Sequence, residues 1–434
     1  MWQTIKNAFA DKDIRRRIFL TIGVLFLFRI GSFIPLPGLD YAYVEKAMDG
    51  NQVFEMMSMM SGGALQYGTL FALGILPFIN SFIIMQLLTL IIPPLERLSK
   101  QGDDGREKIT TITRYVAIVL AVVQSIGIIV TFNNAGAIQE TFGSVAVTAI
   151  MLIIMLTAGS TLVMWLGERI TEYGIGNGTS LIIFVGIISG LGTGLVSASA
   201  TVKDNYVNIF NIIGYLLLIV LLFIFIVFVD GSERRIKVNY AKQVKGNKMY
   251  GGQSTFIPIK VNSSGVMPII FASSFMMFPQ MIVSFIDQNS SLVSFYYRYL
   301  SPYGNFWVGN LVYYLIMFLL IIFFAYFYAQ IQFNPQDVAR NLQQYGGTIQ
   351  GVRPGKATSD YLAKINNRIT LFGALFLAFI AIIPVFLFRL IGENIGLTNA
   401  FSATGMLIVV SVALELDKQL ESQIMMRHYK GFLK

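Results

Sequence analysis

The sequence contains no cysteine and one histidine, His428. Without cysteine the chain can form no disulfide, no thiolate metal site and no cysteine nucleophile. The position of His428, close to the last residue, argues against a buried histidine ligand or general base. The sequence also lacks HExxH, GxSxG and paired aspartates in apolar segments, so the motifs that an intramembrane protease needs are missing. We therefore expect no enzymatic activity, no metal and no cofactor.

Charge is also scarce, because only 13% of the 434 residues are charged while 55% are hydrophobic. A mean hydropathy of +0.65 places the chain among polytopic membrane proteins. Apolar runs of about 17–25 residues suit membrane-spanning helices. The sequence predicts ten such spans, at 18–34, 61–92, 113–132, 144–166, 179–199, 208–229, 265–286, 307–332, 369–389 and 399–416.

The basic residues favour one orientation of these spans. If the N-terminus is cytoplasmic, most of the 32 lysines and arginines fall on the cytoplasmic side. Lys46, Lys203 and Arg298 are then external, and Arg29 and Arg389 lie near outer helix ends. The positive-inside rule therefore predicts that both termini are cytoplasmic. The spans otherwise hold almost no ionisable groups, unlike those of ion-coupled transporters, which bury charges along the transport path.

Residues 61–95 contain no Asp, Glu, Lys or Arg. As one helix they would extend about 52 Å, whereas the hydrocarbon core of a bilayer is only about 30 Å thick. Gly74 and Pro77 mark the expected break, because proline interrupts helical hydrogen bonding. We expect a short front helix over 61–73 and a full-length helix over 74–92. A short helix at membrane depth must face protein or a water-filled cavity.

A long basic loop, residues 230–264, divides the chain near its centre. Residues 1–229 hold spans one to five with the short front helix, plus span six, and residues 265–434 hold spans seven to ten. The second part also carries a cytoplasmic loop, 334–368, and a tail, 418–434. Two halves of five spans each would have opposite orientations, as inverted repeats do. Pro77, Pro268 and Pro279 interrupt the second span of each half, which marks the expected working interface.

Several local patterns have more than one interpretation. Gly174, Gly176 and Gly178 resemble a phosphate-binding loop, but they follow a helix, so a helix end and tight turn fit better. The basic loop 233–248 fits a surface attracted to anionic lipid. Its alternating residues 235–240 favour instead a short strand and hairpin. With the second basic loop, 346–355, it would form a docking surface for a large soluble partner. Isoleucines at helical spacing are most often packing residues.

Ordered motifs then carry a resemblance over nearly the whole chain. They are FRIGSFIPLPG (28–38), SGGAL (61–65), FALGILPFINSFIIMQLL (71–88), GREKIT (105–110), WLGERITEYGIGNGTS (165–180), ERRIKVNYA (233–241), QSTFIPIKVNSSGVMPIIFASS (253–274), GVRPG (351–355) and MMRHY (425–429). By these motifs the chain resembles the bacterial SecY family, the channel subunits of the general protein translocase.

The resemblance implies an hourglass channel that conducts unfolded polypeptide outward and releases hydrophobic helices sideways into lipid. The matching plug residues are Ser61, Gly62, Gly63, Ala64 and Leu65. The matching aliphatic pore ring is Ile79, Ile83, Ile183, Ile187, Ile270 and Ile408. The matching lateral gate, between spans two and seven, includes Asn80, Gln124, Ser273 and Ser274. Asn80 stands where relatives usually carry a smaller residue, and Thr179 where isoleucine is common.

The resemblance also implies partners and a location. The matching docking residues are Arg234, Arg235, Lys242, Lys248 and Arg353. They would receive the SecA motor ATPase and the ribosome, while the SecE and SecG subunits, membrane lipids and the secretory precursor or its signal sequence complete the partners. The expected location is the bacterial cytoplasmic membrane. A secondary transporter is the alternative, since it too would show inverted repeats and a broken helix.

Overall fold

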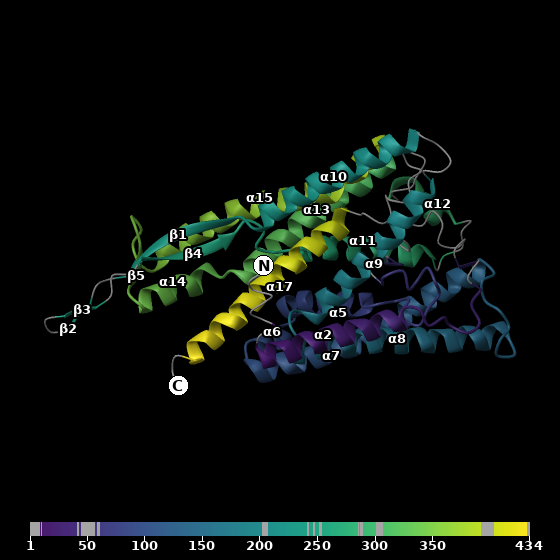
Figure 1. Cartoon of the computed structure of the whole chain (residues 1–434), viewed down its shortest axis with the longest axis horizontal. Helices are drawn as coiled ribbons and strands as arrows, with labels where there is room; N and C mark the ends of the chain where they lie inside the picture. Colours follow the sequence, from purple (N-terminus) through teal and green to yellow (C-terminus); the bar gives the residue numbers. More distant parts are fainter. Residues whose placement is uncertain are drawn as a thin grey trace. The chain divides into compact units, whose positions relative to one another are not determined.

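The structure is a computed structural model of the chain. It describes residue 9 and residues 11–40, 43–44, 57–58, 61–201, 207–240, 243–245, 248–250, 254–284, 286, 290–300, 307–391 and 403–431. The fold is mostly helical (Figure 1).

Each of the ten predicted apolar runs overlaps a helix. These helices are α2 (Lys12–Gly31), α5 (Leu76–Ile91), α7 (Asp103–Asn134), α8 (Val145–Tyr173), α9 (Gly178–Thr201), α10 (Val207–Asp230), α11 (Met267–Ser284), α13 (Trp307–Gln332), α15 (Lys356–Ile391) and α17 (Ala403–Gly431). Shorter helices are α6 (Pro93–Ser99), α12 (Ser291–Tyr299) and α14 (Pro335–Gln344).

Length and hydropathy identify the helices that can cross a membrane. Among the described residues there are 4 such segments, Asp103–Asn134, Val145–Tyr173, Asn310–Gln344 and Lys356–Pro384. Helices α5 and α6 are bent by 104° relative to each other, and if they form one span the number of candidate spans rises to 5. Shorter apolar helices include Gly178–Gly190, Leu217–Asp230 and Met267–Met276. The chain is thus a multi-pass helical membrane protein.

The helix ends follow local sequence signals. The Asp11 side chain accepts hydrogen bonds from the backbone of Asp13 and Ile14 and so caps α2. The turn between α8 and α9 is closed in a similar way, because Asn177 Oδ1 accepts from the backbone N–H groups of Thr179 and Ser180 at 3.0 and 3.3 Å. Its glycine-rich sequence therefore forms a helix end and a tight turn, as predicted.

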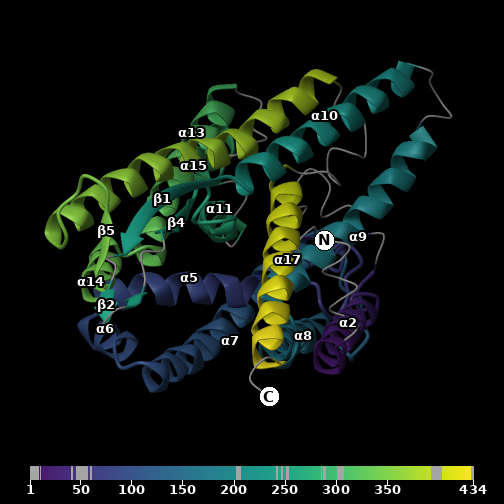
Figure 2. The ribbon, with the colours of Figure 1, turned by 60° about the vertical axis from the view of Figure 1, so that its left-hand side comes forward.

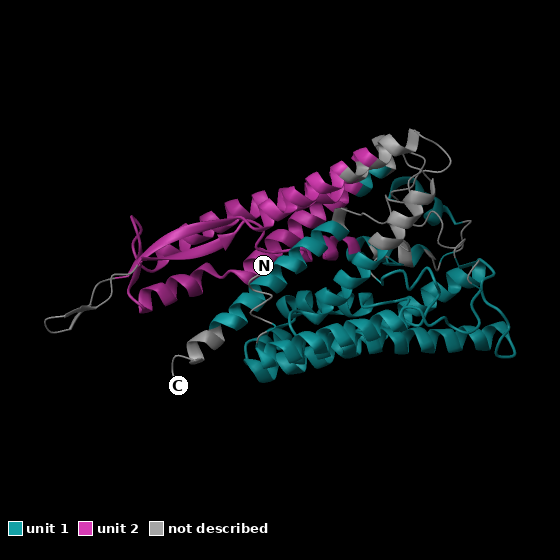
Figure 3. Ribbon diagram, viewed as in Figure 1, with its two compact units in different colours: residues 1–212, 274–313, 393–434 teal, residues 213–273, 314–392 magenta. Residues whose placement is uncertain are grey.

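The chain divides into two compact units (Figure 3). Unit 1 comprises residues 1–212, 274–313 and 393–434, and unit 2 comprises residues 213–273 and 314–392. Each unit combines segments from both sides of the basic loop 230–264. The division therefore does not follow the chain order of the two predicted halves.

In unit 1, helix α7 packs against both α5 and α8, and α2 packs on α8 (Figures 1 and 2). Polar side chains join α7 to α8 at two levels. The Ser125 and Thr157 hydroxyls lie 3.2 Å apart, and Arg114 pairs with Glu168 at 2.7 Å. Small and hydroxyl side chains allow helices to approach closely where both surroundings and core are apolar. These contacts hold α7 and α8 together.

Unit 2 carries a three-stranded sheet in the order β4–β1–β5. Strand β1 (Glu233–Tyr240) pairs antiparallel with β4 (Ser254–Lys260) and with β5 (Gly347–Ile349). Alternate residues of β1 join a buried cluster with α14 and α15, which consists of Ile236, Val238, Ile259, Leu342, Ile349 and Leu362. A separate hairpin, β2 (Gln243–Lys245) with β3 (Lys248–Tyr250), extends the loop. The strand and hairpin predicted for the basic loop are confirmed.

Candidate functional site

The break predicted in residues 61–95 is confirmed, but the predicted front helix is wrong. Helix α5 begins at Leu76 with Pro77 in its first turn, which is the position where proline costs no hydrogen bond. Residues 61–75 form consecutive turns. Gly62 and Gly74 have φ of +71° and +54°, a left-handed conformation that interrupts a right-handed helix and favours glycine. We call residues 61–67 the tip and residues 68–75 the root of this segment.

The root is fixed to its neighbours by backbone contacts. Thr69 forms an antiparallel bridge with Pro35, and Leu36 N donates to Gly68 O at 3.0 Å while Leu70 N donates to Ile34 O at 3.0 Å. On helix α8, a Cβ at Gly159 would lie only 2.0 Å from the Leu70 carbonyl oxygen. Beside it, Ser160 Oγ donates to Gly74 O at 3.1 Å. The root is therefore packed against α8 at a distance that only glycine allows.

Most of the tip is buried within unit 1 although it lacks regular structure, whereas Gln66 and Tyr67 are exposed. Ser61, Ala64 and Leu65 have no exposed surface. Ser61 Oγ donates to Ser58 O at 3.0 Å and accepts from Leu65 N at 3.3 Å, so that the turn closes on itself. Burial of polar backbone is tolerated when such partners are supplied. These residues, with Gly62 and Gly63, are those predicted for the plug.

The six isoleucines predicted for the pore ring are all buried. Their exposed fractions are 6% for Ile79, Ile83, Ile270 and Ile408 and 2% for Ile183 and Ile187. Within α5, Ile79 and Ile83 lie one helical turn apart on a buried face of the helix, whereas Phe82 is 42% exposed. Ile408 lies on α17, which packs on α9, the helix of Ile183 and Ile187. Ile270 belongs to unit 2.

The predicted gate residues are also buried, and several lack partners. Asn80 on α5 and Gln124 on α7 are 3% and 6% exposed, and neither side-chain oxygen accepts a hydrogen bond from the described residues. Nearby, Ser81 Oγ donates to Thr113 O at 2.5 Å and joins α5 to α7. Ser273 and Ser274 on α11 are buried, and the Ser273 hydroxyl also lacks a partner among the described residues. A buried polar group without a hydrogen-bond partner costs free energy in the arrangement that buries it.

Three of the five basic residues predicted for the docking surface lie on or beside the sheet of unit 2. Arg234 and Arg235 extend from β1, and both are exposed. Arg235 Nε pairs with Glu233 at 2.7 Å. Arg353 is exposed in the loop that follows β5, where its carbonyl accepts from Thr358 Oγ1 at 2.8 Å. Lys248 begins β3, and Lys242 lies outside the described residues.

Sequence reasoning missed that the two basic loops form one sheet. Val238 of the first loop pairs with Ile349 of the second, and Tyr240 pairs with Gly347. Thr348 Oγ1 also donates to Asn239 O at 3.2 Å across the pair. The alternating residues 347–349 are too few to predict a strand alone, so no local signal could have found this pairing.

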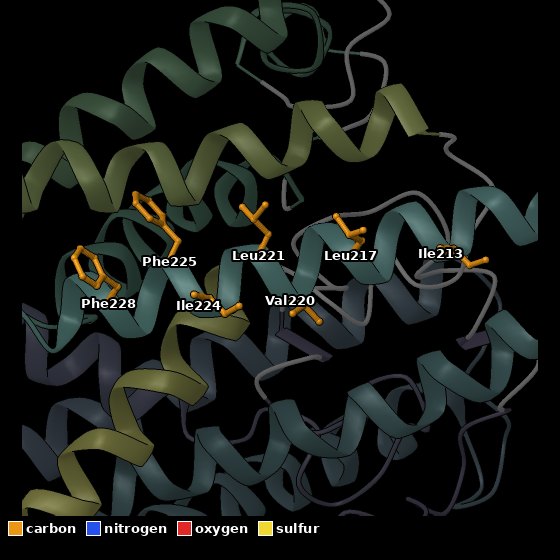
Figure 4. Close-up of a pocket in the computed structure, with 7 residues that line it drawn as sticks. All are labelled: Ile213, Leu217, Val220, Leu221, Ile224, Phe225 and Phe228. Carbon is orange, nitrogen blue, oxygen red and sulfur yellow. The ribbon is translucent and has the colours of Figure 1, made fainter.

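An apolar groove runs along α10 in unit 2 (Figure 4). All the side chains that line it come from this helix: Ile213, Leu217, Val220, Leu221, Ile224, Phe225 and Phe228. Phe228 is 72% exposed, and Phe225 packs edge-on against Phe376 of α15. An exposed apolar helix face in a membrane protein suits contact with lipid chains. Within the described ranges no group of His, Asp or Glu residues could hold a metal ion.

The fold and these sites define a multi-pass helical membrane protein with a largely buried non-helical segment and a basic sheet. The SecY family model matches residues 69–416. The protein translocase subunit SecY of Streptomyces galbus is 41% identical over 451 residues, which cover 100% of both chains. The chain therefore belongs to the SecY family of protein translocase subunits.

Solved structures show the same fold. One is SecY whose plug domain stabilises the closed translocation channel and maintains a membrane seal, with a TM-score of 0.65 and 22% identity over 94% of this chain and 91% of that one. Another is Sec61 in the canine ribosome–channel complex, with a TM-score of 0.63 and 20% identity over the same shares of the two chains. The secondary transporter considered from the sequence is not supported.

Proposed function

We propose that this chain is a passive channel that conducts unfolded secretory polypeptides across the membrane and releases transmembrane helices sideways into lipid. The observation that carries the proposal is the non-helical and mostly buried segment 61–75 of unit 1, which leads directly into helix α5. Irregular backbone at membrane depth occurs where it is surrounded by protein or lines an aqueous cavity. Membership of the SecY family supports the same function.

The tip would be the plug that closes the channel. Ser61, Gly62, Gly63, Ala64 and Leu65 belong to it, and their burial with internal hydrogen bonds fits a seal that moves as a unit. The six buried isoleucines would form the pore ring. Aliphatic side chains offer water and ions no partner and yet can yield around a passing chain. Such a channel needs no chemistry of its own, and we infer no enzymatic activity and no cofactor.

The lateral gate would lie between α5, with its partner α7, and α11. Asn80, Gln124, Ser273 and Ser274 supply the polar groups there, and the unpaired oxygens of Asn80 and Gln124 favour a weakly held closed state. Interhelical polar contacts in membranes contribute about 0.6 kcal/mol each on average, which an inserting signal sequence could replace. The full architecture would be ten spans in two inverted halves, 1–229 and 265–434, with the basic loop 230–264 between them.

The sheet of unit 2 would be the cytoplasmic docking surface. Arg234, Arg235 and Arg353, with Lys242 and Lys248 of the same loops, give it a basic character that suits acidic protein or ribosomal RNA. The resemblance to Sec61 of the canine ribosome–channel complex supports a ribosome as one partner. SecA, SecE and SecG would be the others, in a bacterial cytoplasmic membrane with both termini on the cytoplasmic side.

Reconstitution separates this function from small-solute transport. The purified chain with its partner subunits is placed in liposomes and supplied with an unfolded precursor, the motor and ATP. We expect the precursor to become protected from added protease, and protection to require the motor. Uptake of small solutes driven by an ion gradient, without precursor protection, would contradict the proposal.

A further inference from the structure

Arg29 of α2 contacts the tip directly. Its Nη1 donates to the Gly62 carbonyl oxygen at 2.9 Å, and its guanidinium lies over the Phe33 ring at 5.0 Å from the centroid. None of the ion pairs formed by the described residues includes Arg29. The arginine side chain is charged at all physiological pH values and only donates hydrogen bonds. The Gly62 carbonyl oxygen is therefore a principal polar partner of the half-buried Arg29 guanidinium.

The surroundings of Gly62 fit this contact closely. A Cβ on Gly62 would lie 2.7 Å from Arg29 Nη1 and 3.0 Å from the Cα of Gly186 in α9. The tip therefore approaches α2 on one side and α9 on another, and two glycines permit it. Phe33, beneath the guanidinium, also packs against Tyr67 at the other end of the tip, with ring centroids 6.5 Å apart. Arg29 and Phe33 thus hold both ends of the tip.

Other hydrogen bonds of the tip go to residues that flank it in the chain. Gly63 N and Ser61 Oγ both donate to Ser58 O, at 2.7 and 3.0 Å, and Thr69 Oγ1 donates to Ala64 O at 2.9 Å. The bonds to Ser58 stay intact if the tip moves together with that residue, whereas the bond from Thr69 joins the tip to the root. The root is fixed separately, by α8 and by residues 34–36. Release of the tip from a fixed root would therefore break the Arg29 contact together with the bond between Thr69 and Ala64.

We propose that Arg29 is a positioning residue that latches the plug in the closed channel by binding its backbone at Gly62. This inference rests on the proposed plug function of the tip. A hydrogen bond from a charged donor is stronger than a neutral one, and its loss leaves a carbonyl unpaired in a buried place. Loss of the latch should raise the fraction of open tips about tenfold, as expected for a contact of this kind.

Because the sequence has no cysteine, one introduced thiol can report release of the tip. Ser61→Cys places one thiol at a position with no exposed surface, so that a maleimide reaches it only when the tip leaves its site. The rate of labelling of the complete complex in liposomes, without precursor, is compared between parent, Arg29→Gln and Arg29→Lys. Ser125→Cys, in the fully buried core of α7, reports general loosening. Arg298→Gln is the control for loss of an arginine on the side predicted to be external.

We expect Arg29→Gln to label about tenfold faster than parent at Ser61→Cys, with Arg29→Lys between them, and Arg298→Gln to match parent. The latch is overturned if Arg29→Gln labels at the parental rate, or if labelling at Ser125→Cys rises by the same factor. Ion leakage of the resting channel, measured on the same variants, tests separately whether the tip is the seal. Faster labelling with unchanged leakage supports the latch and contradicts the tip as the seal.

Discussion

Gly159 of α8 offers the sharpest test of how the root of the non-helical segment 61–75 is held in place. A Cβ there would lie 2.0 Å from the oxygen and 2.9 Å from the carbon of the Leu70 carbonyl. The obstacle is backbone, so no side-chain rotation relieves it. Gly159→Ala should therefore push the root away from α8, at a cost of about 1–3 kcal/mol as for other overpacked sites. The closed state should become roughly 5- to 150-fold less populated relative to displaced states.

The assay is ion leakage of resting channels in planar bilayers. Ser160→Ala adds no volume and removes only the 3.1 Å hydrogen bond to Gly74 O, so we expect a smaller increase, corresponding to about 1 kcal/mol. Gly23→Ala in α2, where a Cβ meets nothing within 4 Å, should behave as parent. Parental leakage in Gly159→Ala, in complexes that assemble normally, would refute the claim that contact with α8 maintains the seal.

Three further predictions concern the ring, the docking surface and the sheet. The double substitution of Ile79 and Ile183 by glycine should raise the ion conductance of the resting channel. An unchanged conductance would mean that these two isoleucines are ordinary packing residues. Arg353→Glu should abolish motor-driven export while the protein still inserts and assembles, because it reverses an exposed charge; normal export would refute its docking role. Leu362→Ala, at a site with no exposed surface, should destabilise the sheet by about 2–5 kcal/mol and speed proteolysis of the basic loops, whereas parental resistance would contradict that packing.

Much of the helical architecture follows from local chemistry. The length of the apolar runs predicts where each helix lies, and Gly74 with Pro77 predicts the start of α5 within a few residues. The conformation of residues 61–73 was mispredicted as helix, because apolar composition was allowed to outweigh glycine. Gly62 and Gly74 adopt positive φ there, and the backbone bonds of the root go to residues 34–36 instead of along a helix.

The functional arrangement depended more on distant contacts. Spacing alone could not distinguish Ile79 and Ile83 from ordinary packing residues, and the resemblance was needed to assign their role. The pairing of Val238 with Ile349 joins segments that the chain separates by the four helices α11 to α14, and no local pattern specifies such a partner. Arg29 looked like an interfacial residue at a helix end. Its bond to Gly62 becomes visible only when the turn of the tip brings that carbonyl to α2.

The passage of polypeptide through the chain is tested most directly by crosslinking during secretion. A photoactivatable residue is placed at Ile83, which is 6% exposed, or at its neighbour Phe82 on α5, which is 42% exposed, and a precursor is stalled during export. A polypeptide channel predicts strong capture of the precursor at position 83, at Ile270 as well, and little at position 82. No capture at 83 or 270, or equal capture at 82, would contradict the account.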